Sequence, residues 1–350
     1  MDVSDFPPLP PANRMPDFDN LLAVLHRERP RRPTLYELFL NDRLYRRFAR
    51  PDILAAADLD KPLDRYRVRI SAYERAGYDY AHYDTPFAFP ADPIHQANSI
   101  SQNEGAVIHD RETFNACPWP DMERVDYSLL DPIAALLPPK MKLVANCPSG
   151  VLENAVRLVG YEALCLLIHD DPDLTSDVFA QVGKRLVANA RTLVAHPAIG
   201  ALMCNDDWGH RTQTMISPAA MRQYVFPWHQ QMIEAAHRHG KPALLHSCGN
   251  PAQIMEDIIG IGFDARHSYE DNISPVEDFY DAWHKRIAVL GGIDVDFLCR
   301  QPLEAVTARS KAMLARAAAD GAYALGTGNS VAPYIDDDRY CAMTRAALEG

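Results

Sequence analysis

Two residues with metal-binding side chains, His246 and Cys248, stand at the end of a short apolar run. The run Ala243–Leu245 follows Pro242, ends before Gly249-Asn250, and predicts a buried strand of a parallel sheet. Residues two apart on an extended segment point to the same side, and an imidazole with a thiolate suits zinc. A buried histidine beside an inert core cysteine is the alternative interpretation.

Carboxylates and histidines follow other apolar runs in the same way. Asp206 and Asp207 follow the run at residues 199–204. A pair of carboxylates there could orient a ligand histidine or act as a general acid, and an exposed turn is the alternative. His267 and Asp294 also stand at expected strand ends, although a buried core position would explain His267 as well.

Strands and helices are expected to alternate along most of the chain. Helical segments of about 10 to 25 residues separate the strands, and this alternation predicts a parallel sheet. We expect an α/β fold, a (β/α)₈ TIM barrel whose active site lies in the loops at the carboxyl ends of the strands. An open doubly wound sheet is the alternative, but no Gly-x-Gly-x-x-Gly follows the first strand. The expected strands lie within residues 78–84, 141–147, 199–204, 243–246, 262–271, 286–294 and 321–330.

The N-terminal region has a different character. Residues 1–30 are rich in proline and show little periodicity, so we expect an extended or partly disordered arm on the surface. Residues 34–49 read as one or two amphipathic helices. Several arginines lie close together within Arg43–Arg50. A helix face exposed to solvent explains this grouping better than an anion-binding site does. We therefore predict a proline-rich arm over 1–30 and a single barrel domain over 31–350, with this helical, proline-rich extension at the N-terminus.

The composition is that of a globular protein with an acidic surface. Of the 350 residues, 47% are hydrophobic and 23% charged, and the formal net charge is -12. This charge opposes general binding to nucleic acid or to an anionic membrane. No apolar run could span a membrane, and Met1–Pro16 lacks the features of an export signal, so we expect a cytoplasmic protein. The seven scattered cysteines predict reduced thiols.

Three motifs in this order resemble the uroporphyrinogen decarboxylase superfamily. They are His-Ser-Cys-Gly-Asn at His246–Asn250, Gly-Gly-Ile-Asp at Gly291–Asp294 and Gly-Thr-Gly-Asn at Gly326–Asn329. The resemblance covers roughly residues 30–350 and implies a (β/α)₈ barrel. The superfamily includes metal-free porphyrinogen decarboxylases and zinc-dependent methyltransferases that act with corrinoid proteins and coenzyme M. The catalytic barrel of cobalamin-independent methionine synthase is a more distant member.

The resemblance also implies a set of metal ligands. A His-x-Cys pair at a strand end binds zinc in the methyltransferase branches, which makes His246 and Cys248 the expected ligands. Those enzymes take a further cysteine from the last loop, whereas Gly326–Ser330 contains none. A glutamate at the next strand end binds the zinc in methionine synthase, and Glu270 stands in the matching position. Three protein ligands leave a fourth position for water or substrate, as is usual in catalytic zinc sites.

A zinc-dependent methyltransferase is therefore the function that the resemblance favours. It would move a methyl group from a small O-, N- or S-methyl donor to a corrinoid protein or a thiol. Zinc would polarise the leaving group or hold a thiol as thiolate. We expect a small-molecule methyl donor and a corrinoid co-substrate carried by a partner protein, and we leave a homodimer open.

Two other functions remain as alternatives. One is a metal-free decarboxylase of a tetrapyrrole or aromatic acid, for which Asp84 matches the aspartate that holds the pyrroles in such enzymes. Their N-terminal Arg-Gln-Ala-Gly-Arg-Tyr stretch is absent here, and Thr327 stands near the position of their histidine. The other is a non-catalytic, ligand-binding barrel.

We assign catalysis to Asp207, Asp84 and Asn250. We assign substrate binding to Trp208, His267, Asp294 and Asn329. Asp207 and Asn250 should line one pocket with His246.

Overall fold

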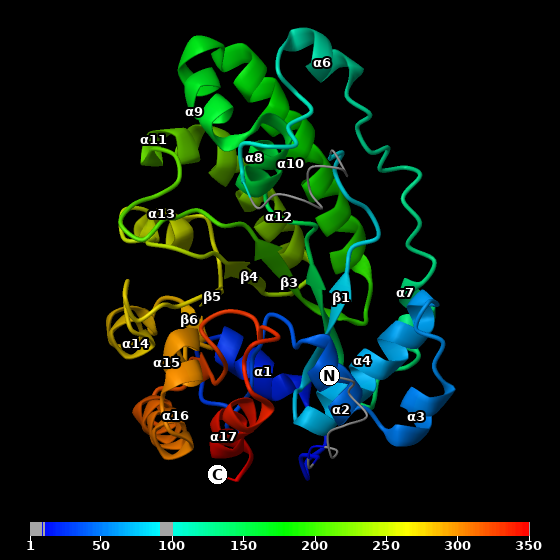
Figure 1. Cartoon of the computed structure of the whole chain (residues 1–350), viewed down its shortest axis with the longest axis vertical. Helices are drawn as coiled ribbons and strands as arrows, with labels where there is room; N and C mark the ends of the chain where they lie inside the picture. Colours follow the sequence, from blue (N-terminus) through cyan, green and yellow to red (C-terminus); the bar gives the residue numbers. More distant parts are fainter. Residues whose placement is uncertain (1–8, 10, 92–100, 350) are drawn as a thin grey trace. The chain divides into compact units, whose positions relative to one another are not determined.

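The computed structural model describes residues 9, 11–91 and 101–349. Seven strands form one sheet in the order β1 to β7, and helices connect successive strands (Figure 1). The pairs β3–β4, β5–β6 and β6–β7 are parallel. The predicted α/β fold with a parallel sheet is confirmed, and all the expected strands are present. Their bounds are β1 Tyr80–Asp84, β2 Lys142–Asn146, β3 Ile199–Asn205, β4 Ala243–His246, β5 Ala265–His267, β6 Ala288–Leu290 and β7 Tyr323–Ala324.

The chain divides into two compact units. Unit 1 consists of Met1–Tyr83, Tyr127–Val144 and Asp264–Gly350, and unit 2 of Asp84–Asp126 and Ala145–Phe263. The boundary between an arm and a single domain at residue 30 remains a prediction. Among the described residues, no helix has the length and apolar character needed to cross a membrane.

The helices are assigned to the units as follows. Unit 1 contains α1 Phe18–Leu25, α2 Asp42–Phe48, α3 Pro51–Ala56, α4 Pro62–Ala76, α7 Leu130–Ala134, α14 Val276–Trp283, α15 Val295–Arg300, α16 Leu303–Ala317 and α17 Asp337–Leu348. Unit 2 contains α6 Arg111–Ala116, α8 Val151–Val159, α9 Tyr161–Asp170, α10 Pro172–Ala195, α11 Pro218–Ala220, the π-helical turn η2 Met221–Val225, α12 Phe226–Arg238 and α13 Met255–Gly260.

In unit 2, the long helix α10 packs against α12, and both contact β3 (Figure 1). Helix α10 begins after Asp171, whose side chain accepts the backbone N–H of Leu174 at 2.8 Å. Helix α11 begins after Ser217, whose hydroxyl accepts the N–H of Ala220 at 3.2 Å. The helical run then continues through η2 into α12. His229, which lies on α12, is fully buried.

Helix α1 in unit 1 differs from the sequence prediction. Leu21 and Val24 are fully buried on this helix, three residues apart on its apolar face. The prediction that all of residues 1–30 form an extended arm is therefore wrong for Phe18–Leu25. Most prolines of residues 1–30 lie before Phe18. The short amphipathic pattern that follows them is therefore hard to recognise from the composition of the whole segment.

A strand-like segment at Thr34–Tyr36 also departs from the prediction of a helix over residues 34–49. Leu35 forms a parallel bridge with Leu325, directly after β7. Tyr36 donates its N–H to the carbonyl of Leu325 at 2.8 Å, and Leu325 donates to the carbonyl of Thr34 at 2.8 Å. Residues 34–38 are all buried, which suits an extended chain covered on both faces better than an amphipathic helix. The predicted helix is present only further on, as α2.

The side chain of Glu37 continues this link into the core of unit 1. The carboxyl is completely buried, and its Oε1 accepts the backbone N–H of Thr327 at 2.8 Å. The hydroxyl of Thr327 lies 2.6 Å from Oε2 and also contacts the carbonyl of Asn329. A single hydroxyl has one proton to donate. Both contacts are satisfied together when Glu37 keeps its own proton and donates it to Thr327.

Burial agrees with this proton count, because it raises the pKa of Glu37 from 4.5 to about 8, although the backbone N–H of Thr327 opposes that change by favouring the ionised form. The neighbouring His267 does not interfere, since burial lowers its pKa to about 3 and keeps it neutral above that pH. Below about pH 8, a neutral carboxylic acid therefore links the segment at Thr34–Glu37 to the loop that follows β7.

Replacing Glu37 by glutamine tests this protonation state. The folded pKa lies above the unfolded one, so the stabilisation is complete below about pH 4.5 and is lost as the pH rises towards 8. Glu37→Gln cannot ionise, so its free energy of unfolding in urea, relative to that of the wild type, should rise by about 1.4 kcal/mol per pH unit across that window. The exposed Glu304→Gln serves as control and should show no such trend. A Glu37→Gln curve parallel to that of the wild type would show that Glu37 is ionised.

Candidate metal centre

The paired ends of β3 and β4 build the site in unit 2. Their parallel register places Asn205 opposite His246. Beyond this pair the two loops stay joined, because Asp206 donates its N–H to the carbonyl of His246 at 2.9 Å. Trp208 donates its own N–H to the hydroxyl of Ser247 at 3.1 Å. Two loops that the sequence separates by about forty residues therefore run side by side.

Glycines allow the two loops to approach so closely. Gly249 has a φ of +82°, and a Cβ built on it would lie 2.1 Å from the carbonyl oxygen of Gly209. A side chain at residue 249 would therefore be strained by its backbone and would collide with the neighbouring loop. The glycine directly after Cys248 is thus a requirement of the site.

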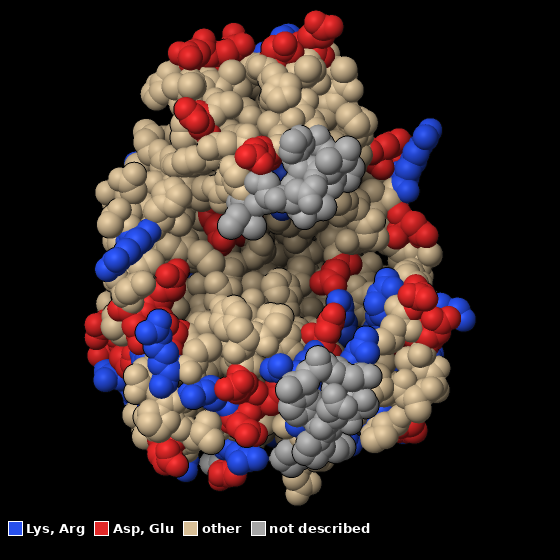
Figure 2. Space-filling model, viewed as in Figure 1, with Lys and Arg blue, Asp and Glu red and all other residues tan. Residues whose placement is uncertain are grey.

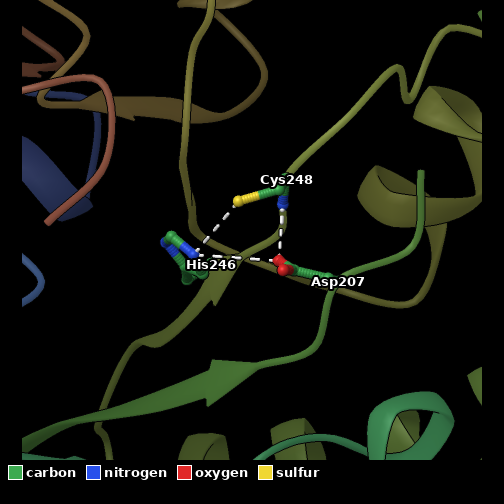
Figure 3. A group of neighbouring side chains, drawn as sticks. All are labelled: Asp207, His246 and Cys248. Atoms are coloured by element: carbon green, nitrogen blue, oxygen red, sulfur yellow. Dashed lines mark hydrogen bonds and ion pairs between the residues drawn. The ribbon is translucent and has the colours of Figure 1, made fainter. Parts of the chain in front are cut away.

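Three side chains meet at this point: Asp207 from the loop after β3, and His246 and Cys248 from the end of β4 (Figure 3). Their candidate ligand atoms all lie within 4.8 Å of one another. The sulfur of Cys248 lies 3.6 Å from Nε2 of His246, and that nitrogen lies 3.8 Å from Oδ1 of Asp207. The same carboxylate oxygen accepts the backbone N–H of Cys248 at 2.8 Å. We call Asp207, His246 and Cys248 the three-residue cluster.

The spacing of His246 and Cys248 fits a zinc ion, whereas Oδ1 of Asp207 lies 3.8 Å from Nε2 of His246 and would move closer to bind the same ion. Tetrahedral zinc at about 2.1 Å from nitrogen and about 2.3 Å from sulfur separates those two ligand atoms by about 3.5 Å. The separation of 3.6 Å between His246 and Cys248 matches that value. Imidazole, thiolate and carboxylate are all zinc ligands, and three of them leave one position open. Within the described part of the chain, this is the group of side chains suited to hold a metal ion.

The electrostatics of the cluster depend on how deeply each group lies. The side chain of His246 is 5% exposed, whereas that of Asp207 is 39% exposed, so solvent reaches the cluster beside the aspartate. Partial burial raises the pKa of Asp207, and the N–H of Cys248 opposes that change by stabilising the carboxylate. A bound cation would favour the ionised form of this carboxylate.

Glu153 is a nearby acid that the sequence analysis missed. It lies in the first turn of α8, and its Oε2 accepts from Nδ2 of Asn205 at 3.2 Å. Burial, together with the charges of Asp206 and Asp207, raises the pKa of Glu153 to about 8. Near neutral pH, such a carboxyl can donate a hydrogen bond or a proton. The signal in the sequence was the spacing Gly150-x-x-Glu153 after β2, which is typical of a helix start.

The other predicted site residues of unit 2 lie outside the three-residue cluster. Asp84, at the end of β1, is exposed, and its Oδ1 accepts from Nδ2 of Asn146 at 3.3 Å. Asn250 is half-buried and caps its own loop by accepting the N–H of Ala252. Trp208 is 1% exposed and packs edge-on against Phe226. This burial favours a packing role for Trp208, and substrate contact by any of these three residues stays a prediction.

The remaining predicted residues belong to unit 1. Glu270 is half-buried in the loop after β5, and its role as a zinc ligand stays a prediction. His267 is fully buried, with Nε2 3.2 Å from the carbonyl of Thr327. Asp294 caps α15 through Oδ1 and accepts the N–H of Asp271 through Oδ2. Asn329 is half-buried in the loop after β7 and accepts the N–H of Ser330. The predicted substrate contacts of these residues are untested.

Comparison with known proteins agrees with this architecture. A family model described as uroporphyrinogen decarboxylase (URO-D) matches residues 60–349. Among solved structures, a methyltransferase from Methanosarcina mazei matches with a TM-score of 0.72 at 16% identity, over 94% of this chain and 97% of that chain. At this identity the likeness shows the fold alone, and it confirms the predicted TIM-barrel-like fold.

Two further comparisons add little. Xylanase B from Clostridium stercorarium F9 matches with a TM-score of 0.40 at 11% identity, over 60% of this chain and 74% of that chain. A likeness this weak carries no argument about function. No protein with a curated description matches the sequence.

The identity of the third ligand can be tested by substitution. Asp207→Asn should lower the affinity for zinc by about 10-fold or more, because an amide neither carries charge nor binds zinc as well as a carboxylate. The matched control is Asp84→Asn, another acid at a strand end, which should bind zinc as the wild type does. The measurement is competition with a chromogenic chelator. Unchanged affinity in Asp207→Asn would remove Asp207 from the ligand set, and Glu270→Gln then tests the ligand that the resemblance implies.

Proposed function

Because the chain belongs to the uroporphyrinogen decarboxylase family, we propose that it is an enzyme of that family which transfers a methyl group at a zinc centre. The observation that carries the proposal is the three-residue cluster, in which His246, Cys248 and Asp207 bring three different ligand atoms within 4.8 Å of one another. The methyl donor is a small O-, N- or S-methyl compound. The acceptor is a corrinoid protein or a thiol.

Each residue of the cluster has a defined part in this proposal. Zinc held there would supply Lewis acidity to the leaving group of the donor, or would hold an acceptor thiol as its thiolate. His246 contributes a neutral nitrogen, while Cys248 and Asp207 each contribute a negative charge that offsets the charge of the ion. The carboxylate donates less electron density than a second thiolate would. A Cys–His–Asp set therefore keeps the ion a stronger Lewis acid than a set with two cysteines.

The solvent-exposed side of the cluster supports access by a substrate. The side chain of Asp207 is 39% exposed, whereas His246 lies almost fully inside. A catalytic zinc site needs an open position, in contrast to a structural site in which four protein ligands enclose the ion. We therefore expect the methyl donor to approach the cluster from the side of Asp207, since His246 faces the interior.

The arginines near the N-terminus argue against the decarboxylase alternative. A tetrapyrrole with several carboxylates needs several free cations to bind it. Arg43 instead contacts Oδ1 of Asp337 at 2.9 Å through Nε, and Arg47 contacts Oδ2 of the same carboxylate. Arg50 pairs with Asp52. More generally, basic side chains on the face drawn in Figure 2 lie among acidic ones. These pairs engage three of the four arginines within Arg43–Arg50, which counts against binding of a polyanionic substrate there.

Metal analysis and a transfer assay test the proposed function together. The purified protein should contain about one zinc per chain. It should also convert cob(I)alamin to methylcobalamin, followed by absorbance, with at least one donor from a panel of methyl ethers, methylamines and thioethers. Removing the zinc with a chelator should abolish transfer, and adding zinc back should restore it, because no other group in the cluster supplies Lewis acidity.

Uroporphyrinogen serves as the control substrate in the same experiment. His246→Ala should lose both zinc and transfer, since it removes the most buried of the three ligands. A protein that binds no zinc and decarboxylates uroporphyrinogen would contradict the proposal and establish the alternative.

A further inference from the structure

Asp206, the neighbour of the candidate ligand Asp207, has a carboxylate that is completely buried. Its oxygens accept three backbone N–H groups from the start of α8. Oδ2 accepts from Val151 at 2.9 Å and from Leu152 at 3.0 Å, and Oδ1 accepts from Glu153 at 2.9 Å. The first N–H groups of a helix have no partner within the helix, and the helix dipole favours a negative charge there. Asp206 therefore joins the end of β3 to the start of α8.

His229 completes the surroundings of this carboxylate. Its Nε2 lies 2.9 Å from Oδ2 of Asp206, and both side chains have no exposed surface. A carboxylate oxygen only accepts, so we assign the hydrogen to Nε2. The ring packs edge-on against Trp208, with the ring centroids 5.1 Å apart, and also contacts Phe263. These contacts leave the imidazole little freedom to turn.

The space that Asp206 occupies depends on a glycine. A Cβ at Gly150 would lie 1.9 Å from the Cγ of Asp206. Any other residue at this position would push the carboxylate away from the helix N–H groups. The backbone of Gly150 itself has an ordinary φ of -96°, so the requirement here is for space and not for conformation.

The same stretch of chain holds the candidate centre. The backbone N–H of Asp206 donates to the carbonyl of His246 at 2.9 Å, and the next side chain along, Asp207, accepts the N–H of Cys248. The position of the peptide between Asp206 and Asp207 thus sets the direction of the Asp207 carboxylate. This peptide is held by its hydrogen bond to β4 on one side. On the other side it is held by the hydrogen bonds of the Asp206 side chain to α8 and His229.

We propose that Asp206 and His229 are positioning residues of the metal centre, which hold the Asp207 carboxylate in place for binding the ion. This inference rests on the proposed function, because it assumes that the three-residue cluster binds a metal. It differs from the role of a simple helix cap. Loss of a helix cap lowers the folding stability alone. Loss of a positioning residue also lowers the affinity for the metal, by more than the change in folding stability explains.

Two substitutions of His229 separate these roles in the full-length protein. His229→Phe keeps an aromatic ring against Trp208 and removes the N–H that Asp206 accepts. His229→Gln replaces the ring but retains an N–H donor. Loss of a hydrogen bond behind a metal ligand typically costs 10- to 100-fold in affinity. We expect His229→Phe to bind Zn²⁺ and Co²⁺ about 10-fold or more weakly than the wild type, and His229→Gln to recover most of that loss.

The control is Leu186→Ala, which removes a fully buried side chain of α10 and should lower the melting temperature without changing the metal affinity. The visible spectrum of the Co²⁺-loaded proteins adds a second measurement, since it reports the geometry around the ion. Should His229→Phe not fold, Asp206→Asn replaces it, because it keeps the shape of the side chain and removes one acceptor oxygen.

Each outcome bears on a separate claim. Weaker binding in His229→Phe with recovery in His229→Gln supports the positioning role. Wild-type affinity and an unchanged Co²⁺ spectrum in His229→Phe would overturn it, and leave the metal centre intact. A wild-type protein that binds neither ion would overturn the metal centre itself, and this inference with it.

Discussion

The parallel pairing of β3 with β4 is the interaction on which the candidate centre depends. Its register sets Asn205 opposite His246, and the hydrogen bonds beyond this pair bring Asp207 beside Cys248. Side chains alternate between the two faces of a strand, so a slip of one residue would turn His246 away from the partner loop. The metal-binding geometry is thus a consequence of strand pairing, and the loops only extend it.

The centre places three acidic residues close together, and the structure stabilises each of them in a different way. Asp206 is buried but surrounded by four N–H donors from α8 and His229. Asp207 keeps contact with solvent and accepts one backbone N–H. Glu153 keeps its proton, because burial and the two neighbouring charges raise its pKa to about 8. The N–H donors around Asp206 and the proton on Glu153 reduce the repulsion among the three acids, and Asp207 remains available for a cation.

Periodicity and spacing predicted much of this molecule. The strands followed from apolar runs that end in polar residues, and the pairing of His246 with Cys248 followed from their spacing of two. The strand-like segment at Thr34–Tyr36 could not be predicted, because it depends on a bridge to a residue almost 300 positions away. The place of Asp207 in the cluster likewise depends on register between two strands, which a single sequence does not specify. The resemblance implied Glu270 instead, and that ligand remains a prediction.

The number of sulfur atoms bound to the metal is the quantity that tests the central claim most directly. X-ray absorption at the zinc edge of the purified wild-type protein resolves sulfur ligands from lighter ones, because the zinc–sulfur distance of about 2.3 Å exceeds that to nitrogen or oxygen by about 0.2 Å. We expect one sulfur, from Cys248, with nitrogen and oxygen in the remaining positions. Two or more sulfur ligands, or none, would contradict a centre built from His246, Cys248 and Asp207.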